Sequence, residues 1–246
     1  MFYIYIMCIL VATKNLYMEI KKVPLEKDEY YNEIFEKDTI YIHHTAGSHR
    51  PDWTVACWEH DKNKEGLALK VATAYVVGGI STRDIKDVAW DGVIVNCFDD
   101  KLWAHHLGST TANNSILNKK SVAIEVCNYG PLVLGKDGNF YNYVKGLVPK
   151  EQVTTLDKPF RGHIYYHSYT TKQIESLKWL LQDIARRNPK INLKKGLQEL
   201  LGNDDAFELN QVALKGYPGL WSHTNIRKDK SDMYPHPELL KMIASL

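Results

Sequence analysis

The chain has 246 residues, of which 44% are hydrophobic and 24% are charged, and its formal net charge is +2. These proportions are ordinary for a soluble globular protein, and the length suits one domain with insertions as well as two domains. The small net charge argues against a dedicated nucleic-acid-binding protein, which would carry a strongly basic domain or stripe. The four cysteines form no CxxC pair, so we expect reduced thiols and no disulfide scaffold.

The first twelve residues, Met1 to Ala12, are almost all apolar. No basic residue precedes them, as a secretory signal requires, and a membrane span needs about 20 apolar residues. Three interpretations stay open: a short strand, a degenerate signal, or an extension upstream of a start at Met7 or Met18. We therefore treat residues 1–20 as an N-terminal extension of uncertain role. We expect a protein made in the cytoplasm, with no convincing signal peptide and no stable membrane insertion.

Hydrophobic periodicity and turn residues predict the elements up to residue 127. Residues 24–38 predict a turn and a short helix, and 39–45 predict an apolar strand. A helix is expected over 52–62, after Pro51 and with Asp52 as its N-cap. Short strands are predicted around 71–78, 93–98 and 121–127, with glycine-containing turns between them.

The clearest helix spans residues 171–187. Thr170 and Gln173 form a capping box before it, and Asn188-Pro189 ends it. Its apolar positions recur at helical spacing: Ile174, Leu177, Leu181 and Ile184.

Residues 188–220 are interpreted as an insertion. A short amphipathic piece is expected in it, around Leu197, Leu200 and Leu201. Tyr217-Pro218-Gly219 then turns the chain into a final short strand that ends near His223.

Strand alternation separates the side chains of residues 39–45 into two faces. Ile40, Ile42 and His44 share one face, and Tyr41, His43 and Thr45 share the other. If the isoleucines pack in the core, His43 points away from it and His44 is a buried, hydrogen-bonded neighbour. By the same alternation, Glu125 lies opposite Val122, Ile124 and Val126 in the strand at 121–127. A carboxylate in an apolar strand is costly to bury unpaired, so such an acid is usually bonded, paired or functional.

Two histidine-bearing segments lie near opposite ends of the chain. One contains His43-His44-Thr45-Ala46-Gly47, and the other contains His223 and is followed by Asp232. Neutral imidazole and carboxylate are good ligands for a zinc ion, and three protein ligands with an open fourth position are typical of a hydrolytic site. The two segments are therefore interpreted as halves of one metal site.

Four segments in the same order resemble a known family, the type 2 class of zinc-dependent N-acetylmuramoyl-L-alanine amidases. This family shares its fold with phage amidase lysozymes and animal peptidoglycan recognition proteins. The similar segments are His43 to Gly47, Trp103-Ala104-His105-His106-Leu107-Gly108, Ser121 to Glu125 with Asn128-Tyr129-Gly130, and His223-Thr224-Asn225-Ile226 with Lys230-Ser231-Asp232.

The resemblance implies roles for eight residues. The metal ligands would be His43, His223 and Asp232, the cofactor would be Zn²⁺, and the catalytic residues would be Glu125 and Lys230. The substrate-binding residues would be His106, Thr45 and Asn128. Ala74 stands where many members have a catalytic tyrosine, with Tyr75 one step on; members without that tyrosine rely on the acid that Glu125 matches.

The resemblance also implies the fold and the substrate. We expect an α/β fold in a single domain, with a central mixed β-sheet flanked by helices over residues 21–246. The expected reaction is hydrolysis of the amide between N-acetylmuramic acid and L-alanine of peptidoglycan, by a monomer that acts on the cell wall as a phage lysin or a bacterial wall-remodelling enzyme. Two alternatives remain: a non-catalytic peptidoglycan-binding module of the same fold, which would lack a zinc ligand, and a metallohydrolase acting on another amide.

Overall fold

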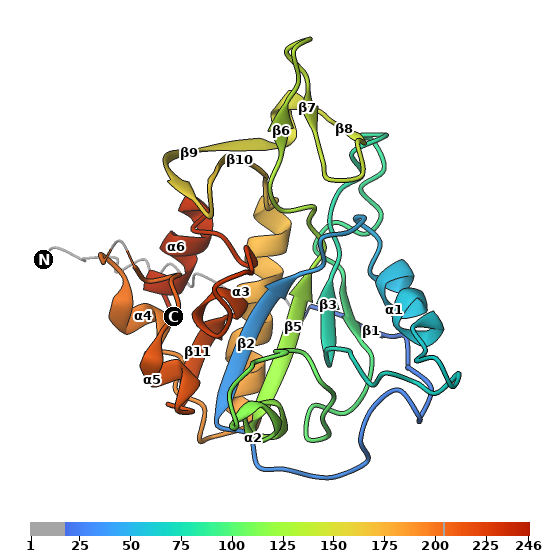
Figure 1. The fold of residues 1–246 in the computed structure, drawn as a ribbon, viewed down its shortest axis with the longest axis vertical. Helices are drawn as coiled ribbons and strands as arrows, with labels where there is room; N and C mark the ends of the chain where they lie inside the picture. Colours follow the sequence, from blue (N-terminus) through green and yellow to red (C-terminus); the bar gives the residue numbers. More distant parts are fainter. Residues whose placement is uncertain (1–17, 204) are drawn as a thin grey trace, which may run out of the picture.

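A six-stranded sheet in the order β1-β4-β3-β5-β2-β11 forms the centre of the computed structural model, which describes residues 18–203 and 205–246 (Figure 1). Cys8 and the predictions for residues 1–17 lie outside the described part. The strands are β1 (Ile20–Lys22), β2 (Thr39–His44), β3 (Tyr75–Val77), β4 (Ile94–Asn96), β5 (Ser121–Val126) and β11 (Gly219–Ser222). β3 and β4 pair antiparallel, whereas the other neighbours run parallel. The predicted α/β fold with a mixed central sheet is confirmed.

Helices flank this sheet, and α3 (Thr171–Arg187) is the longest of those described. It packs behind the sheet in Figure 1, together with α6 (Pro237–Ala244). Its predicted limits and its capping box are confirmed. The remaining helices are α1 (Pro51–His60), α2 (Asn114–Lys120), α4 (Leu197–Leu200), α5 (Gln211–Leu214) and the 3₁₀ turns η1 (Lys150–Gln152) and η2 (His223–Asn225). Within the described residues, no helix is long and apolar enough to cross a membrane.

Two small antiparallel sheets stand beyond the end of the main sheet where β2 and β5 finish (Figure 1). One contains β6 (Val133–Leu134), β7 (Phe140–Tyr141) and β8 (Leu147–Val148), and the other pairs β9 (Val153–Phe160) with β10 (His163–His167). Both belong to the segment between β5 and α3, which the sequence left without predicted elements.

The two faces of β2 enter different clusters, as its alternation predicts. Ile40 and Ile42 belong to the main core between the sheet and α3. Tyr41 belongs to a smaller cluster on the opposite face, where it packs with Leu107 and Trp221. His43 is two residues after Tyr41 in the strand, so its side chain lies on the same face as Tyr41 and points away from the main core.

Residues 24–38 form a turn but no helix, so this part of the prediction was wrong. Tyr31 donates its backbone N–H to Trp103 and Phe35 donates to Lys101, at 2.8 and 3.0 Å. A helix would need these donors for carbonyls four residues earlier in the chain. The segment instead lies extended against residues 101–103.

Three other predicted elements differ in their limits. The first helix begins at Pro51, so Arg50 and not Asp52 holds the N-cap position. The strand expected over 71–78 is regular only from Tyr75 to Val77, and Val71 forms an isolated bridge to His105. The amphipathic piece of 188–220 is the single turn α4.

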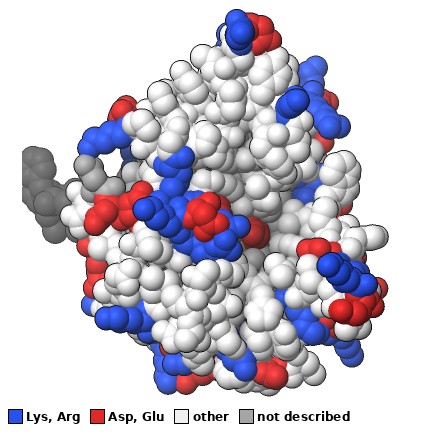
Figure 2. All heavy atoms as spheres, viewed as in Figure 1, with Lys and Arg blue, Asp and Glu red and all other residues white. Residues whose placement is uncertain are grey.

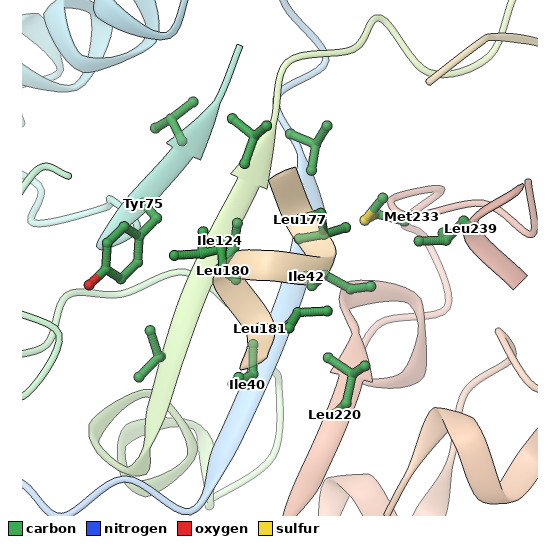
Figure 3. Close-up of a cluster of buried hydrophobic side chains, with 14 of the residues drawn as sticks. Ile40, Ile42, Tyr75, Ile124, Leu177, Leu180, Leu181, Leu220, Met233 and Leu239 are labelled. Carbon is green, nitrogen blue, oxygen red and sulfur yellow. The ribbon is translucent and has the colours of Figure 1, made fainter. Parts of the chain in front are cut away.

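Leu181 lies completely buried in the core, where α3 packs its leucines over β2 and β5 (Figure 3). We expect Leu181→Ala to lower the free energy of unfolding by about 2–5 kcal/mol, since the cavity adds to the lost transfer free energy. Chemical denaturation measures this change. Leu209→Ala is the matched control because Leu209 is exposed, and a loss no greater in Leu181→Ala than in this control would contradict the prediction.

Candidate active site

Three parallel strands bring the predicted site residues to one edge of the sheet. β2 ends with His43 and His44, its neighbour β5 ends with Glu125 and Val126, and β11 on the other side leads directly into His223. His43 is the register partner of Glu125, and Ser222 is the partner of Ile42. Carboxyl ends of adjacent parallel strands meet at the same edge, which is where α/β sheets usually form their sites. Residues about 180 positions apart therefore become neighbours.

His43, His223 and Asp232 form a buried cluster whose possible ligand atoms all lie within 4.8 Å of one another. Oδ2 of Asp232 is 2.8 Å from Nδ1 of His223 and 3.3 Å from Nδ1 of His43. The loop after η2 returns Asp232 to this place, because its backbone carbonyl accepts the N–H of Thr224 at 3.1 Å.

The donor set fits a zinc ion. Ligand atoms about 2.0–2.2 Å from zinc in a tetrahedral site lie roughly 3–3.5 Å apart, which is close to the separations seen here. Nε2 of His223 is 2.8 Å from the carbonyl oxygen of Leu107. Since a carbonyl only accepts, this nitrogen carries the hydrogen, and the Nδ1 atom of His223 is left facing Oδ2 of Asp232. These two atoms form a hydrogen bond without a metal, and a zinc ion bound by both would take the place of the hydrogen.

The charges of the cluster favour the form that binds a metal. Burial, with the nearby His223, lowers the pKa of His43 to about 4, so that this ring is neutral at physiological pH. Although burial opposes its ionisation, the two histidines hold the pKa of Asp232 below its usual range. A neutral imidazole at His43 and an ionised carboxylate at Asp232 are the protonation states that ligate zinc.

Glu125 lies beside His43 on the neighbouring strand. Its Oε2 atom is buried and has no hydrogen-bond partner in the described part of the chain. Burial, helped by Asp232 and opposed by Lys230, raises the pKa of this carboxyl well above its ordinary value. A small cavity of about 40 Å³ adjoins it, between Trp58, Val71 and His105. A buried, unpartnered carboxyl beside a cavity can exchange a proton with a molecule bound there.

Lys230 belongs to the loop that connects His223 to Asp232. Its side chain is partly exposed, and its positive charge acts on His43, Glu125 and other site groups. None of the ion pairs among the described residues involves it, whereas Arg227 in the same loop pairs with Asp229. Figure 2 shows basic side chains near the middle of this face, beside a hollow. The loop thus leaves the ammonium group of Lys230 without an ion-pair partner among the described residues.

The three predicted substrate contacts differ in their surroundings. Thr45 is partly exposed next to the cluster-bearing strand, where its hydroxyl oxygen accepts the N–H of Gly47 at 3.1 Å. The amide of Asn128 is completely buried and donates to the carbonyls of His167 and Ser168. Asn128 therefore supports the turn after β5 and does not face a groove, which corrects its predicted role. His106 is partly buried, and both of its ring nitrogens are bound to protein atoms.

Tyr75 lies on the opposite face of the sheet from Glu125. Its hydroxyl donates to Asp100 at 3.0 Å and receives a hydrogen bond from Arg187 of α3. It pairs with Ile124 in register, and Ile124 faces the main core. Tyr75 therefore cannot substitute for the tyrosine whose position Ala74 occupies.

His44 packs into the fold on the side away from the cluster, as the alternation predicts. Its Nδ1 atom is 3.0 Å from the hydroxyl of Tyr169, and Gly130 approaches so closely that a Cβ there would lie 2.6 Å from its ring. We expect His44→Ala to lower the free energy of unfolding by about 2–3 kcal/mol, because it leaves a cavity and an unpaired tyrosine hydroxyl. Zinc content should stay unchanged by elemental analysis. Loss of zinc without loss of stability would make His44 the ligand instead.

Several supporting groups were not found from the sequence. His223 is bonded to the carbonyl of Leu107. His106 is bonded to Ser121 through its ring and to Asn118 through its backbone N–H. A backbone carbonyl carries no sequence signal, and serine and asparagine near a helix end usually indicate a cap or turn. Only the position of Ser121 at the start of a predicted strand could have drawn attention to it.

A comparison with known protein families identifies the family to which the chain belongs. Residues 34–235 match the family described as N-acetylmuramoyl-L-alanine amidase. The protein belongs to this amidase family. A comparison with the curated proteins finds no match.

Several solved structures match this chain at low sequence identity. PlyL is 11% identical, with a TM-score of 0.49, covering 92% of this chain and 97% of its own. AmpD, as a selenomethionine derivative, is 16% identical, with a TM-score of 0.47 and coverages of 91% and 94%. The N-acetylmuramoyl-L-alanine amidase LysC from Clostridium intestinale is 12% identical, with a TM-score of 0.45 and coverages of 92% and 95%.

Proposed function

We propose that this amidase depends on zinc and hydrolyses the amide between the lactyl group of N-acetylmuramic acid and L-alanine of the stem peptide. The observation that carries the proposal is the buried cluster of His43, His223 and Asp232 with Glu125 beside it. Zinc bound by these three residues would polarise the scissile carbonyl and acidify the attacking water.

Glu125 and Lys230 would supply the proton transfer and a positive charge. A carboxylate whose burial raises its pKa can take a proton from the attacking water and return it to the leaving amine. The ammonium group of Lys230 would stabilise the oxyanion that develops on the carbonyl. Glu125 would thus hold the proton in transit, and Lys230 would place a positive charge beside the negative oxygen of the transition state.

The chemistry of the cluster favours an amidase over a glycosidase. Glycoside hydrolysis usually uses two carboxylates that flank the bond and needs no metal. Here one carboxyl, Glu125, stands unpaired, and Asp232 is engaged by two histidines. A non-catalytic binding module would lack a ligand, whereas this chain has all three.

End-group analysis of digested peptidoglycan tests the proposal. Digestion should release new L-alanine amino termini and no new reducing sugar ends. A chelator should abolish the reaction, and added zinc should restore it. New reducing ends in a chelator-insensitive reaction would show that the enzyme is a glycosidase.

The setting of the reaction is part of the same proposal. We infer a monomer that is made in the cytoplasm and acts on the cell wall, either as a phage lysin or as a bacterial wall-remodelling enzyme. Size-exclusion chromatography with light scattering tests the monomer, and a dimer at working concentration would contradict it.

A further inference from the structure

We propose that the segment His106–Leu107 is a positioning element that orients both histidines of the cluster and fixes the ring tautomer of His43. This inference rests on the proposed metal-dependent function. The segment lies behind both rings, on the side away from Asp232: the ring of His106 contacts His43, and the carbonyl of Leu107 contacts His223.

A chain of three hydrogen bonds leads from the protein backbone to His43. Ser121 Oγ lies 2.7 Å from the carbonyl oxygen of Leu117. Two oxygens at this distance need a hydrogen between them, and a carbonyl has none to give. The hydroxyl of Ser121 therefore donates to Leu117, and its oxygen is left to accept from another group.

The direction of this first bond determines the next two. Nε2 of His106 is 2.9 Å from Ser121 Oγ, so this nitrogen carries the hydrogen and donates. A neutral His106 then has a bare Nδ1 atom, which lies 3.1 Å from Nε2 of His43. For this contact to be a hydrogen bond, Nε2 of His43 must donate. Nδ1 of His43, 3.3 Å from Oδ2 of Asp232, is consequently the ring atom that faces the cluster and can bind a cation there.

The second half of the segment fixes His223 in the same sense. The carbonyl of Leu107 accepts from Nε2 of His223, which leaves its Nδ1 atom, 2.8 Å from Oδ2 of Asp232, as the ring atom that can bind a cation in place of the shared hydrogen. Asn118 holds the segment in place, since its Oδ1 atom accepts the backbone N–H groups of both His106 and Leu107, at 2.8 and 3.2 Å. One two-residue segment thus prepares both imidazoles to bind a cation through the same ring atom.

Nitrogen-15 NMR of the histidine rings in the zinc-loaded protein tests the tautomer directly. His43 should carry its hydrogen on Nε2 and bind the metal through Nδ1. In Ser121→Ala the chain loses its anchor, so the Nε2–H of His43 should exchange with water faster. Protonation of His43 at Nδ1 in the unmodified protein would overturn the proposal, and so would an unchanged exchange rate in Ser121→Ala.

Zinc affinity, measured by competition with a chelator, tests the positioning role. Loss of a group that orients a metal ligand typically weakens metal binding by about 10–100-fold, and we expect this loss for His106→Leu. His106→Asn restores an acceptor oxygen near the position of Nδ1 and should recover most of the affinity. His105→Leu is the matched control, because the ring of His105 bonds to Tyr31 and does not touch the cluster. Equal affinity in His106→Leu and the control would overturn the proposal.

Two further readouts keep the test decisive. If thermal unfolding shows that His106→Leu does not fold, the exchange rate in Ser121→Ala and the affinity of His106→Asn decide the outcome. If the unmodified protein binds no zinc, the proposed function fails; if it binds zinc and His106→Leu binds as tightly as the control, only the positioning role fails.

Discussion

Glu125→Gln should bind zinc as the unmodified protein does and lose about 10²–10⁴-fold in turnover, which is the usual contribution of a general acid–base group. Glutamine matches glutamate in size but cannot accept the proton of the attacking water. Its effect should therefore fall on the chemical step. The measurement is the release of L-alanine amino termini at saturating peptidoglycan, together with elemental analysis of zinc.

The pH dependence of activity provides a second test of the role of Glu125. Proton acceptance requires the ionised carboxylate, so activity should fall as the pH drops through the pKa of Glu125. Because burial raises that pKa well above the ordinary 4.5, the acid limb should lie at higher pH than an exposed glutamate would give. The limb should be missing in Glu125→Gln. Glu175→Gln, exposed on α3, is the matched control, and equal turnover in the two variants would assign the proton transfer to another group.

His223→Ala should remove zinc and with it nearly all activity. This substitution deletes one corner of the cluster and leaves the carbonyl of Leu107 without its donor. The loss of affinity should exceed the roughly 10–100-fold that follows when only a supporting group is removed. Elemental analysis after dialysis and chelator competition both measure it.

The control for His223→Ala is His60→Ala, because His60 is exposed at the end of α1. Its zinc content and turnover should match the unmodified protein. A His223→Ala protein that keeps full zinc content would refute the assignment of His223 as a ligand, whatever its activity.

The parts of the fold that the sequence predicted are those in which local pattern and tertiary packing agree. The helix over 171–187 combines helical spacing with a capping box, and both are seen. In β2 the alternation placed Ile40 and Ile42 in the core and His43 opposite them, because a residue's face in a strand follows from parity alone.

The parts that could not be predicted depend on partners distant in the chain. Residues 24–38 were predicted to include a short helix, but the N–H groups of Tyr31 and Phe35 pair with the backbone of Trp103 and Lys101. The burial of Asn128 follows from the later strand β10, whose end supplies the acceptor carbonyl of His167. No local pattern indicates where such partners lie. The same holds for the role of His106, since its contacts come from two different strands.

The proposed metal ligands are two imidazoles and one carboxylate, and none of them is a thiolate. This composition affects how the enzyme tolerates oxidants. Among the described cysteines, Cys97 and Cys127 are buried with a raised thiol pKa, and Cys57 is exposed on α1. None of these sulfur atoms belongs to the cluster. Peroxide converts thiolates stepwise to sulfenic and sulfinic acids, whereas imidazole and carboxylate ligands offer it no such atom. We therefore expect zinc binding by the proposed centre to be unchanged after treatment with peroxide.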